Sequence, residues 1–217
     1  MSKMTKSAKR LPILLVLLEH DAHPLNANRI RLLLRKMNMK VFGDDFWDAS
    51  VSSGAVGKMC EDLKSVGLVE SEMAKPPRRK QETSHYFLPL NDKEKMLRVT
   101  RLLLDKCGRL FVTSKYAKTV IDRLVIPAAE NALGMKLDSS VRVQIKEICS
   151  ASPGALRRVL DPQLSHALMG IATHNGENPS SNSLLEYLRS AYILDIADES
   201  MILEQKGRLM PVVQETG

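Results

Sequence analysis

The stretch SSGAVGKMCEDLKSVGLVES, residues 52–71, decides how the fold of this chain is interpreted. A small polar cluster, Ser52 to Gly54, has the composition with which helices begin. Gly67 provides a stop, and the pair Leu68-Val69 starts an extended run. The pattern therefore predicts a helix over about residues 52–66 that leads directly into a strand. Its apolar positions recur at steps of three and four residues and share one face: Val56, Met59, Cys60 and Leu63.

The next segment has the composition of an exposed tip between two strands. AKPPRRKQ, residues 74–81, holds four cations and two prolines, which excludes helix and core. SHYFLPL, residues 84–90, follows as a return strand. Helix, strand, basic tip and strand in this order form half of a winged helix-turn-helix, whose helix enters the major groove of DNA. The candidate DNA-contacting residues are Ser52, Ser53, Gly54, Gly57 and Lys58 on the helix, Lys75, Arg78, Arg79 and Lys80 on the tip, and Arg29 upstream.

These residues resemble the winged-helix transcriptional regulators of the PadR and MarR types, and the PadR pattern more closely. The resemblance covers roughly residues 9–90. It implies a regulator that binds double-stranded DNA sequence-specifically as a homodimer, with the basic tip on the DNA backbone or in the minor groove. Two departures stand out: Ser53 replaces the usual proline, and Glu61 and Asp62 put acid on the middle of the helix. The matching residues are Ser52, Gly54, Val56, Leu63, Gly67, Leu68 and Val69.

Composition and charge favour the same class of protein. A chain of 217 residues with 44% hydrophobic residues can bury a core, and aromatic residues make up only 4%, which favours packed helices over a large sheet. The net charge of +7 is uneven: residues 1–123 carry 24 Lys and Arg against 14 Asp and Glu, whereas residues 124–217 carry 8 against 11. We therefore expect the amino-terminal part to meet a polyanion.

The expected fold class is mainly α: an α+β winged-helix head with a small antiparallel wing sheet, followed by an all-α carboxy-terminal region. The expected parts are a basic tail (1–8), the head (9–90), a long connecting and dimerisation helix (91–126), and helices (127–217) for dimerisation or for binding a protein partner or small effector. The connecting helix has an apolar stripe, which predicts a dimer contact or packing on the chain's own carboxy-terminal part. The stripe consists of Met96, Val99, Leu103, Cys107 and Leu110.

Finer details of the head are also predicted. Asn26 or Asn28 is expected to cap the second helix. Val41-Phe42 is expected to supply the first strand of the small sheet. Asn91-Asp92 is expected to cap the connecting helix, with a break near Gly108.

Two helices are expected at the carboxy-terminal end. Ser183 with Glu186 predicts a capping box that starts a helix over Leu184 to Leu194. A separate last helix is expected from about Ala197 to Lys206, where Gly207 follows.

Several classes of chemistry are not indicated. The cysteines, Cys60, Cys107 and Cys149, are odd in number and widely spaced, as reduced intracellular thiols are. The sequence has no phosphate loop, dinucleotide fingerprint, nucleophile elbow or zinc spacing, so no enzyme, cofactor or metal site is expected. No apolar run nears the roughly 20 residues of a membrane span. We expect a cytoplasmic protein, associated with the nucleoid, or nuclear in a eukaryote.

Two alternatives to a transcriptional regulator share the same head. One is a replication, partition or chromosome-organising protein. The other is a winged-helix subunit that holds a protein complex together, and salt-dependent affinity for DNA would separate this class from the others.

Overall fold

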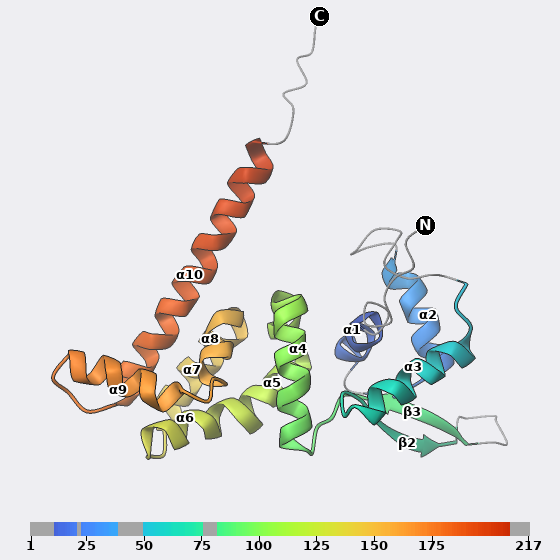
Figure 1. Cartoon of the computed structure of the whole chain (residues 1–217), viewed down its shortest axis with the longest axis horizontal. Coiled ribbons are helices and arrows are strands. Elements are labelled where there is room, and N and C mark those ends of the chain that lie inside the picture. The colour runs from blue at the N-terminus through green and yellow to red at the C-terminus, as the bar shows by residue number, and fades with distance from the viewer. Residues whose placement is uncertain (1–10, 21–22, 39–49, 76–81, 209–217) are drawn as a thin grey trace, which may run out of the picture. The chain divides into compact units, whose positions relative to one another are not determined.

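The computed structural model describes residues 11–20, 23–38, 50–75 and 82–208. It is mainly helical with one small three-stranded antiparallel sheet, which confirms the expected fold class (Figure 1). The chain divides into two compact units. Unit 1 comprises residues up to Lys106 together with Ser114–Val120, and unit 2 comprises Cys107–Thr113 together with residues from Ile121 onward.

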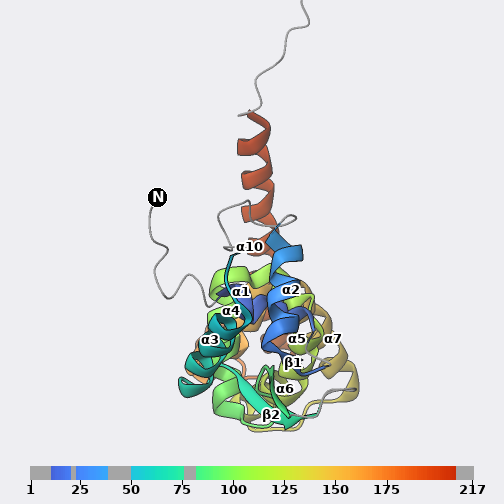
Figure 2. The same ribbon diagram turned by 90° about the vertical axis from the view of Figure 1, so that its right-hand side faces the viewer.

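Unit 1 has the element order of a winged helix, with a strand before its second helix and a hairpin after its third. Figure 2 shows α1, α2, α3 and the hairpin strand β2 turned toward the viewer. The elements are α1 (Leu11–Glu19), β1 (Leu25–Asn26), α2 (Ala27–Asn38), α3 (Ser53–Ser65), β2 (Glu70–Ala74), β3 (Thr83–Phe87), the first part of α4 (Lys93–Val112), and α5 (Lys115–Val120).

The sheet has the order β1-β3-β2, with β3 in the centre. The hairpin prediction is confirmed, because β2 and β3 pair antiparallel from Glu70↔Phe87 to Ala74↔Thr83. The first strand is not where the sequence placed it: β1 lies immediately before α2, where Leu25 pairs with Tyr86. Val41-Phe42 lies outside the described residues. Leu25 and Tyr86 are both buried where they pair, and burial of such a cross-strand pair stabilises the strand.

The predicted helix ends of unit 1 are confirmed by their hydrogen bonds. Asn26 caps α2, because its Oδ1 accepts from the Arg29 N–H at 2.9 Å. Ser52 caps α3, because its Oγ accepts from the Ala55 N–H at 3.2 Å. Gly67 follows α3 with φ +73°, a left-handed conformation that favours glycine. Asp92 caps α4 by accepting from the Glu94 and Lys95 N–H groups at 3.0 and 3.1 Å.

The core of unit 1 is built on α1, in which every residue from Pro12 to Leu18 is buried. A helix that is apolar on all sides needs neighbours on all sides. Those neighbours include α2 and α5. Tyr116 on α5 is fully buried, and its hydroxyl donates to the Pro89 carbonyl oxygen at 2.9 Å.

The apolar stripe of α4 is divided between two environments. Met96, Val99 and Leu103 are fully buried within the single chain. They are therefore core residues, which corrects their assignment to a contact with a second copy. Cys107 is half-buried and Leu110 is 47% exposed. The predicted break lies at Cys107, where φ and ψ are −152° and 42°, outside helical geometry.

Unit 2 is helical throughout its described part. The turn between α6 (Ile126–Leu133) and α7 (Ser139–Ala151) is held by Glu130, which is only 8% exposed. Its carboxylate accepts from Lys136 Nζ at 2.8 Å, from the Leu137 N–H and from Arg142 Nη2. The hydrogen bond from Lys136, together with those from Leu137 and Arg142, lowers the pKa of Glu130 to about 2. Besides the end of α4, the elements are a π-helical turn (Ile121–Val125), α6 (Ile126–Leu133), α7 (Ser139–Ala151), α8 (Pro153–Val159), α9 (Leu164–His174) and α10 (Ser181–Arg208).

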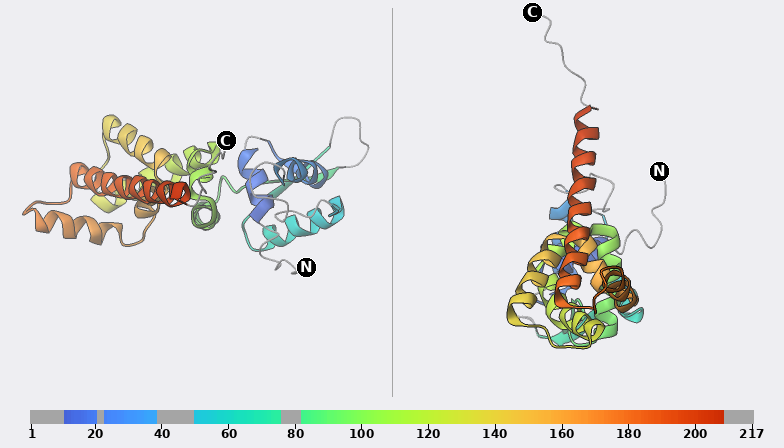
Figure 3. Two further views of the ribbon diagram at one scale, coloured as in Figure 1. Left: turned by 90° about the horizontal axis from the view of Figure 1, so that it is seen from above. Right: turned by 90° about the vertical axis from the view of Figure 1, so that its left-hand side faces the viewer.

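The carboxy-terminal part corrects two predictions. One helix, α10, replaces the two helices expected there, because no proline or glycine interrupts the sequence before Gly207. Its cap is also earlier than expected. The Ser180 N–H donates to Ser183 Oγ at 2.8 Å, and the Ser183 N–H donates to Ser180 Oγ at 3.3 Å, so this pair forms the reciprocal cap. The helix begins against α7, α8 and α9 and extends well past them (Figure 3).

Candidate nucleic-acid interface

The outward side of α3 is arranged largely as its sequence predicts. Val56, Cys60 and Leu63 are fully buried and fix the rotation of the helix. Ser53 and Lys58 are exposed. Positions that lie opposite a buried face can enter the major groove of DNA. The inward and outward sides of α3 are thus set by packing against the rest of unit 1.

The two glycines of α3 differ in their surroundings. Gly54 is exposed, and a Cβ placed there would meet only Ser52 Oγ, at 3.9 Å. Gly57 is half-buried, and a Cβ placed there would lie 3.7 Å from the Ala27 Cβ. Gly57 therefore faces α2, whereas the sequence placed it among the outward residues. The cause is tertiary, because α2 crosses α3 at this point.

A hollow of about 370 Å³ lies where three segments of unit 1 meet. They are the amino-terminal end of α2, the first half of α3, and β3. Several lining residues carry amide or hydroxyl groups, which suit contacts with phosphate and base edges. The lining residues are Asn26, Ala27, Asn28, Ser53, Gly54, Gly57, Thr83, Ser84 and Tyr86.

Sequence reasoning missed four polar residues of this hollow as site residues: Asn26, Asn28, Thr83 and Ser84. Thr83 Oγ1 is buried without a hydrogen-bond partner in the described part of the chain, so it has a free hydrogen-bonding group. Asn28 Oδ1 accepts from Arg31 Nη2 at 3.3 Å. Helical or strand periodicity could not reveal this group, because its members come from segments up to 58 positions apart in the sequence.

The predicted cations are placed unequally by the structure. Arg29 is exposed in the first turn of α2, Lys58 is exposed on α3, and Lys75 is exposed directly after β2. Arg78, Arg79 and Lys80 lie outside the described residues, although the ends of β2 and β3 that flank them are paired through Ala74↔Thr83.

The acidic residue Glu61 is held by the sheet. Its Oε1 accepts a hydrogen bond from the Tyr86 hydroxyl at 3.0 Å, and its Oε2 lies 3.8 Å from Lys64 Nζ. Burial, followed by the hydrogen bond to Glu61, raises the pKa of Tyr86 to about 12. The hydroxyl therefore remains a proton donor at neutral pH, and this contact joins α3 to β3.

The carboxy-terminal end of α3 is tied to α4. Arg98 Nη1 donates to the Val66 carbonyl oxygen at 3.0 Å. Lys95 Nζ lies 3.2 Å from Glu70 Oε1, at the start of β2. Arg98 and Lys95 of α4 therefore hold the turn around Gly67. This turn positions both α3 and the hairpin.

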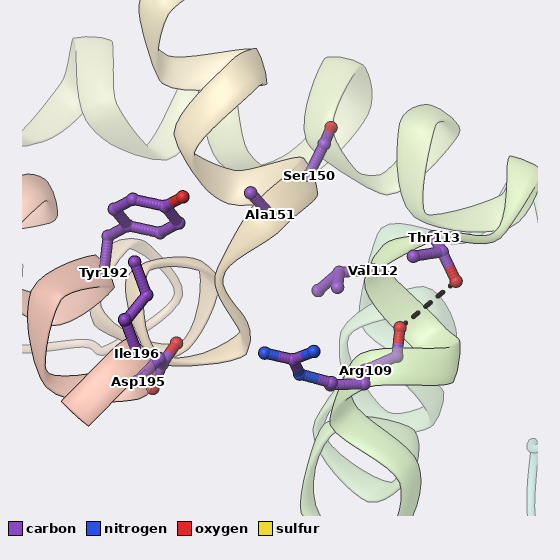
Figure 4. Close-up of a pocket in the computed structure, with 8 residues that line it drawn as sticks. All are labelled: Arg109, Val112, Thr113, Ser150, Ala151, Tyr192, Asp195 and Ile196. Atoms are coloured by element: carbon purple, nitrogen blue, oxygen red, sulfur yellow. Dashed lines mark hydrogen bonds between the residues drawn. The ribbon is translucent and has the colours of Figure 1, made fainter. Parts of the chain in front are cut away.

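A smaller hollow of about 160 Å³ lies in unit 2, between the ends of α4 and α7 and the middle of α10 (Figure 4). Its Asp195 carboxylate accepts from Ser152 Oγ and, at 2.9 Å, from the Gly154 N–H, so it caps α8. A Cβ at Gly154 would lie 2.6 Å from Asp195 Oδ1, which leaves no room for a side chain there. The Asp195 carboxylate therefore has a structural role, which is to cap α8. The other lining residues are Arg109, Val112, Thr113, Ser150, Ala151, Tyr192 and Ile196.

The cysteines have the properties of structural thiols. Burial raises the pKa of Cys60 and Cys149 to about 12 and that of Cys107 to about 11. All three thiols are therefore protonated at neutral pH, and a protonated thiol is a poor nucleophile and metal ligand. In the ranges that the structure describes, no three His, Cys, Asp or Glu side chains gather where they could hold a metal ion.

Comparison of the chain with protein-family models, curated proteins and solved structures finds no match. None of the helices in the described part of the chain has both the length and the apolarity needed to cross a membrane.

Proposed function

We propose that this protein is a sequence-specific regulator of transcription that binds double-stranded DNA as a homodimer. The observation that supports the proposal best is the hollow of unit 1, around which the amino-terminal ends of α2 and α3 and the strand β3 converge. In a winged helix this side carries the recognition helix and the wing. The resemblance to PadR and MarR regulators in residues 52–69 supports the same assignment.

The charges and dipoles of this side are suited to DNA. The first N–H groups of a helix carry a partial positive charge that attracts phosphate. Arg29 and Lys58 add exposed cations near the starts of α2 and α3, and Lys75 adds one at the hairpin. The proposal assigns backbone contacts to these groups. It assigns base contacts to Ser53, Lys58 and their neighbours on α3.

The homodimer contact is assigned to α10. Met96, Val99 and Leu103 of the α4 stripe are already buried in one chain, whereas four apolar side chains in the middle of α10 are exposed. Clustered exposed apolar residues are typical of protein contacts. Their exposed fractions are 37% for Tyr192, 63% for Ile193, 55% for Leu194 and 45% for Ile196.

The test compares Lys58→Ala with Lys118→Ala, an exposed lysine on α5 that serves as a matched control for charge. Binding is measured by fluorescence anisotropy on a duplex enriched from a random library and on random duplex, across a salt series. We expect Lys58→Ala to weaken binding to the enriched duplex by about 1–3 kcal/mol and to random duplex by less.

Lys118→Ala should leave both affinities nearly unchanged. An absence of salt-dependent binding by the wild-type protein would refute the proposal and favour a winged-helix protein-interaction subunit. Equal losses for the two variants would show that α3 does not contact the DNA.

A further inference from the structure

An acidic side chain continues the outward row of α3. Gly54, Lys58 and Glu61 follow one another at steps of four and three residues, so they lie along one side of the helix. Gly54 and Lys58 are exposed, and the Glu61 side chain is 51% exposed. A carboxylate in this row would lie among the phosphates of a bound duplex, where like charges repel. Non-specific DNA binding gains nothing from it.

The carboxylate is also held in one orientation. Tyr86 is 4% exposed on the central strand, and its hydroxyl donates to Glu61 Oε1 at 3.0 Å. An untethered glutamate has several rotatable bonds and can turn toward water when its neighbour is unfavourable. The hydrogen bond from a buried ring restrains this motion, while Glu61 Oε2 is left to a distant contact, 3.8 Å from Lys64 Nζ.

We propose that Glu61, positioned by Tyr86, reads one base pair by requiring an exocyclic amino group in the major groove. This inference rests on the proposed function. A carboxylate only accepts hydrogen bonds. Cytosine N4 and adenine N6 donate in the major groove, whereas guanine presents O6 and N7 and thymine presents O4, all of them acceptors. Glu61 therefore binds cytosine or adenine and rejects guanine and thymine at its contact.

The restraint by Tyr86 strengthens the rejection. A free carboxylate facing an acceptor atom would rotate away, and little affinity would be lost. A carboxylate bonded to the Tyr86 hydroxyl must give up that hydrogen bond before it can leave. Glu61 is thus the specificity-determining residue, and Tyr86 is a positioning residue that acts through it.

The experiment uses the full-length chain and three variants: Glu61→Gln, Tyr86→Phe and, as a control, Glu72→Gln. Glu72 is exposed on β2, and its substitution changes the net charge by the same amount. Duplexes enriched by the wild-type protein are resynthesised with each of the four bases at every position. Binding of each protein to this set is measured by anisotropy, and circular dichroism verifies that each variant is folded.

We expect the wild-type protein to prefer cytosine or adenine over guanine and thymine by about tenfold at one position. Glu61→Gln should reduce this preference to about threefold or less at that position alone, because an amide also donates to acceptor bases. Tyr86→Phe should reduce it partly, and Glu72→Gln should leave it unchanged. The base present in the enriched duplexes distinguishes cytosine from adenine.

The inference is overturned if Glu61→Gln keeps the wild-type preference at every position, or if Tyr86→Phe, folded and bound to DNA, keeps it. Either result would leave the proposed function intact. An absence of any base preference in the wild-type protein would instead refute sequence-specific binding itself.

Discussion

The helices α4 and α10 both carry large apolar side chains, yet these side chains meet opposite surroundings. Met96, Val99 and Leu103 of α4 are fully buried within one chain. Ile193, Leu194 and Ile196 of α10 are between 45% and 63% exposed. Periodicity indicates that a helix has an apolar face, but elements far away in the sequence decide whether the chain itself covers that face. We therefore expect α4 to contribute to stability and α10 to association.

The largest effect should follow truncation of the buried stripe. Leu103→Ala removes a fully buried side chain and leaves a cavity, so we expect the free energy of unfolding to fall by about 2–5 kcal/mol. Urea unfolding followed by circular dichroism measures the change. The control is Leu110→Ala on the same helix, at a side chain that is 47% exposed. The two substitutions remove the same atoms, so similar losses would contradict the contrast in burial.

A smaller effect, on association, should follow a change in α10. Ile193→Asp places a charge on the exposed apolar face, and we expect it to weaken the homodimer by about tenfold or more. Sedimentation equilibrium measures the dissociation constant. Met169→Asp provides the control, because Met169 is 57% exposed on a different helix, α9. A wild-type protein that stays monomeric at high micromolar concentration would refute the α10 contact.

A third effect, on stability, should appear only in acid solution. It tests the charge of Glu130 rather than the apolar packing of α4 or α10. The folded pKa of Glu130, about 2, lies below its ordinary value of 4.5. Its contribution to stability is therefore complete above pH 4.5 and is lost as the pH falls toward 2. We expect the melting temperature of wild type to fall more steeply over this window than that of Glu130→Gln. Parallel curves for the two proteins would contradict the assigned pKa.

Local patterns predicted much of unit 1 because short-range chemistry determines it. Ser52 caps α3, and Gly67 ends it with a positive φ, through hydrogen bonds that span only a few residues. The buried spacing of Val56, Cys60 and Leu63 follows from the helical repeat alone. The hairpin of β2 and β3 likewise follows from two extended runs around a proline-containing tip.

Patterns failed at two places. The sequence placed the first strand of the sheet at Val41-Phe42, whereas the first strand lies at Leu25-Asn26, where Leu25 pairs with Tyr86. Ser183 is followed by Glu186 in a capping-box spacing, but Ser180 lies three residues before Ser183 and forms the cap instead. In each case contacts made in the folded chain determined which residues form the strand or the cap.

The candidate site also combines features that the local sequence determines with features that the tertiary structure determines. The sequence by itself determined that α3 is a helix with a polar start, a defined inward face and a basic hairpin after it, because these properties depend on neighbours within a few residues. It also determined the excess of positive charge in the amino-terminal part.

Only the tertiary structure decided which of these groups lie together. It brought Asn28, Thr83 and Ser53 to one hollow, turned Gly57 toward α2, and attached Glu61 to Tyr86 across 25 residues. It also buried Met96, Val99 and Leu103 of α4 and left apolar side chains of α10 exposed. The physical reason is that burial and side-chain hydrogen bonds depend on distance in space, and the packing of helices and strands sets that distance.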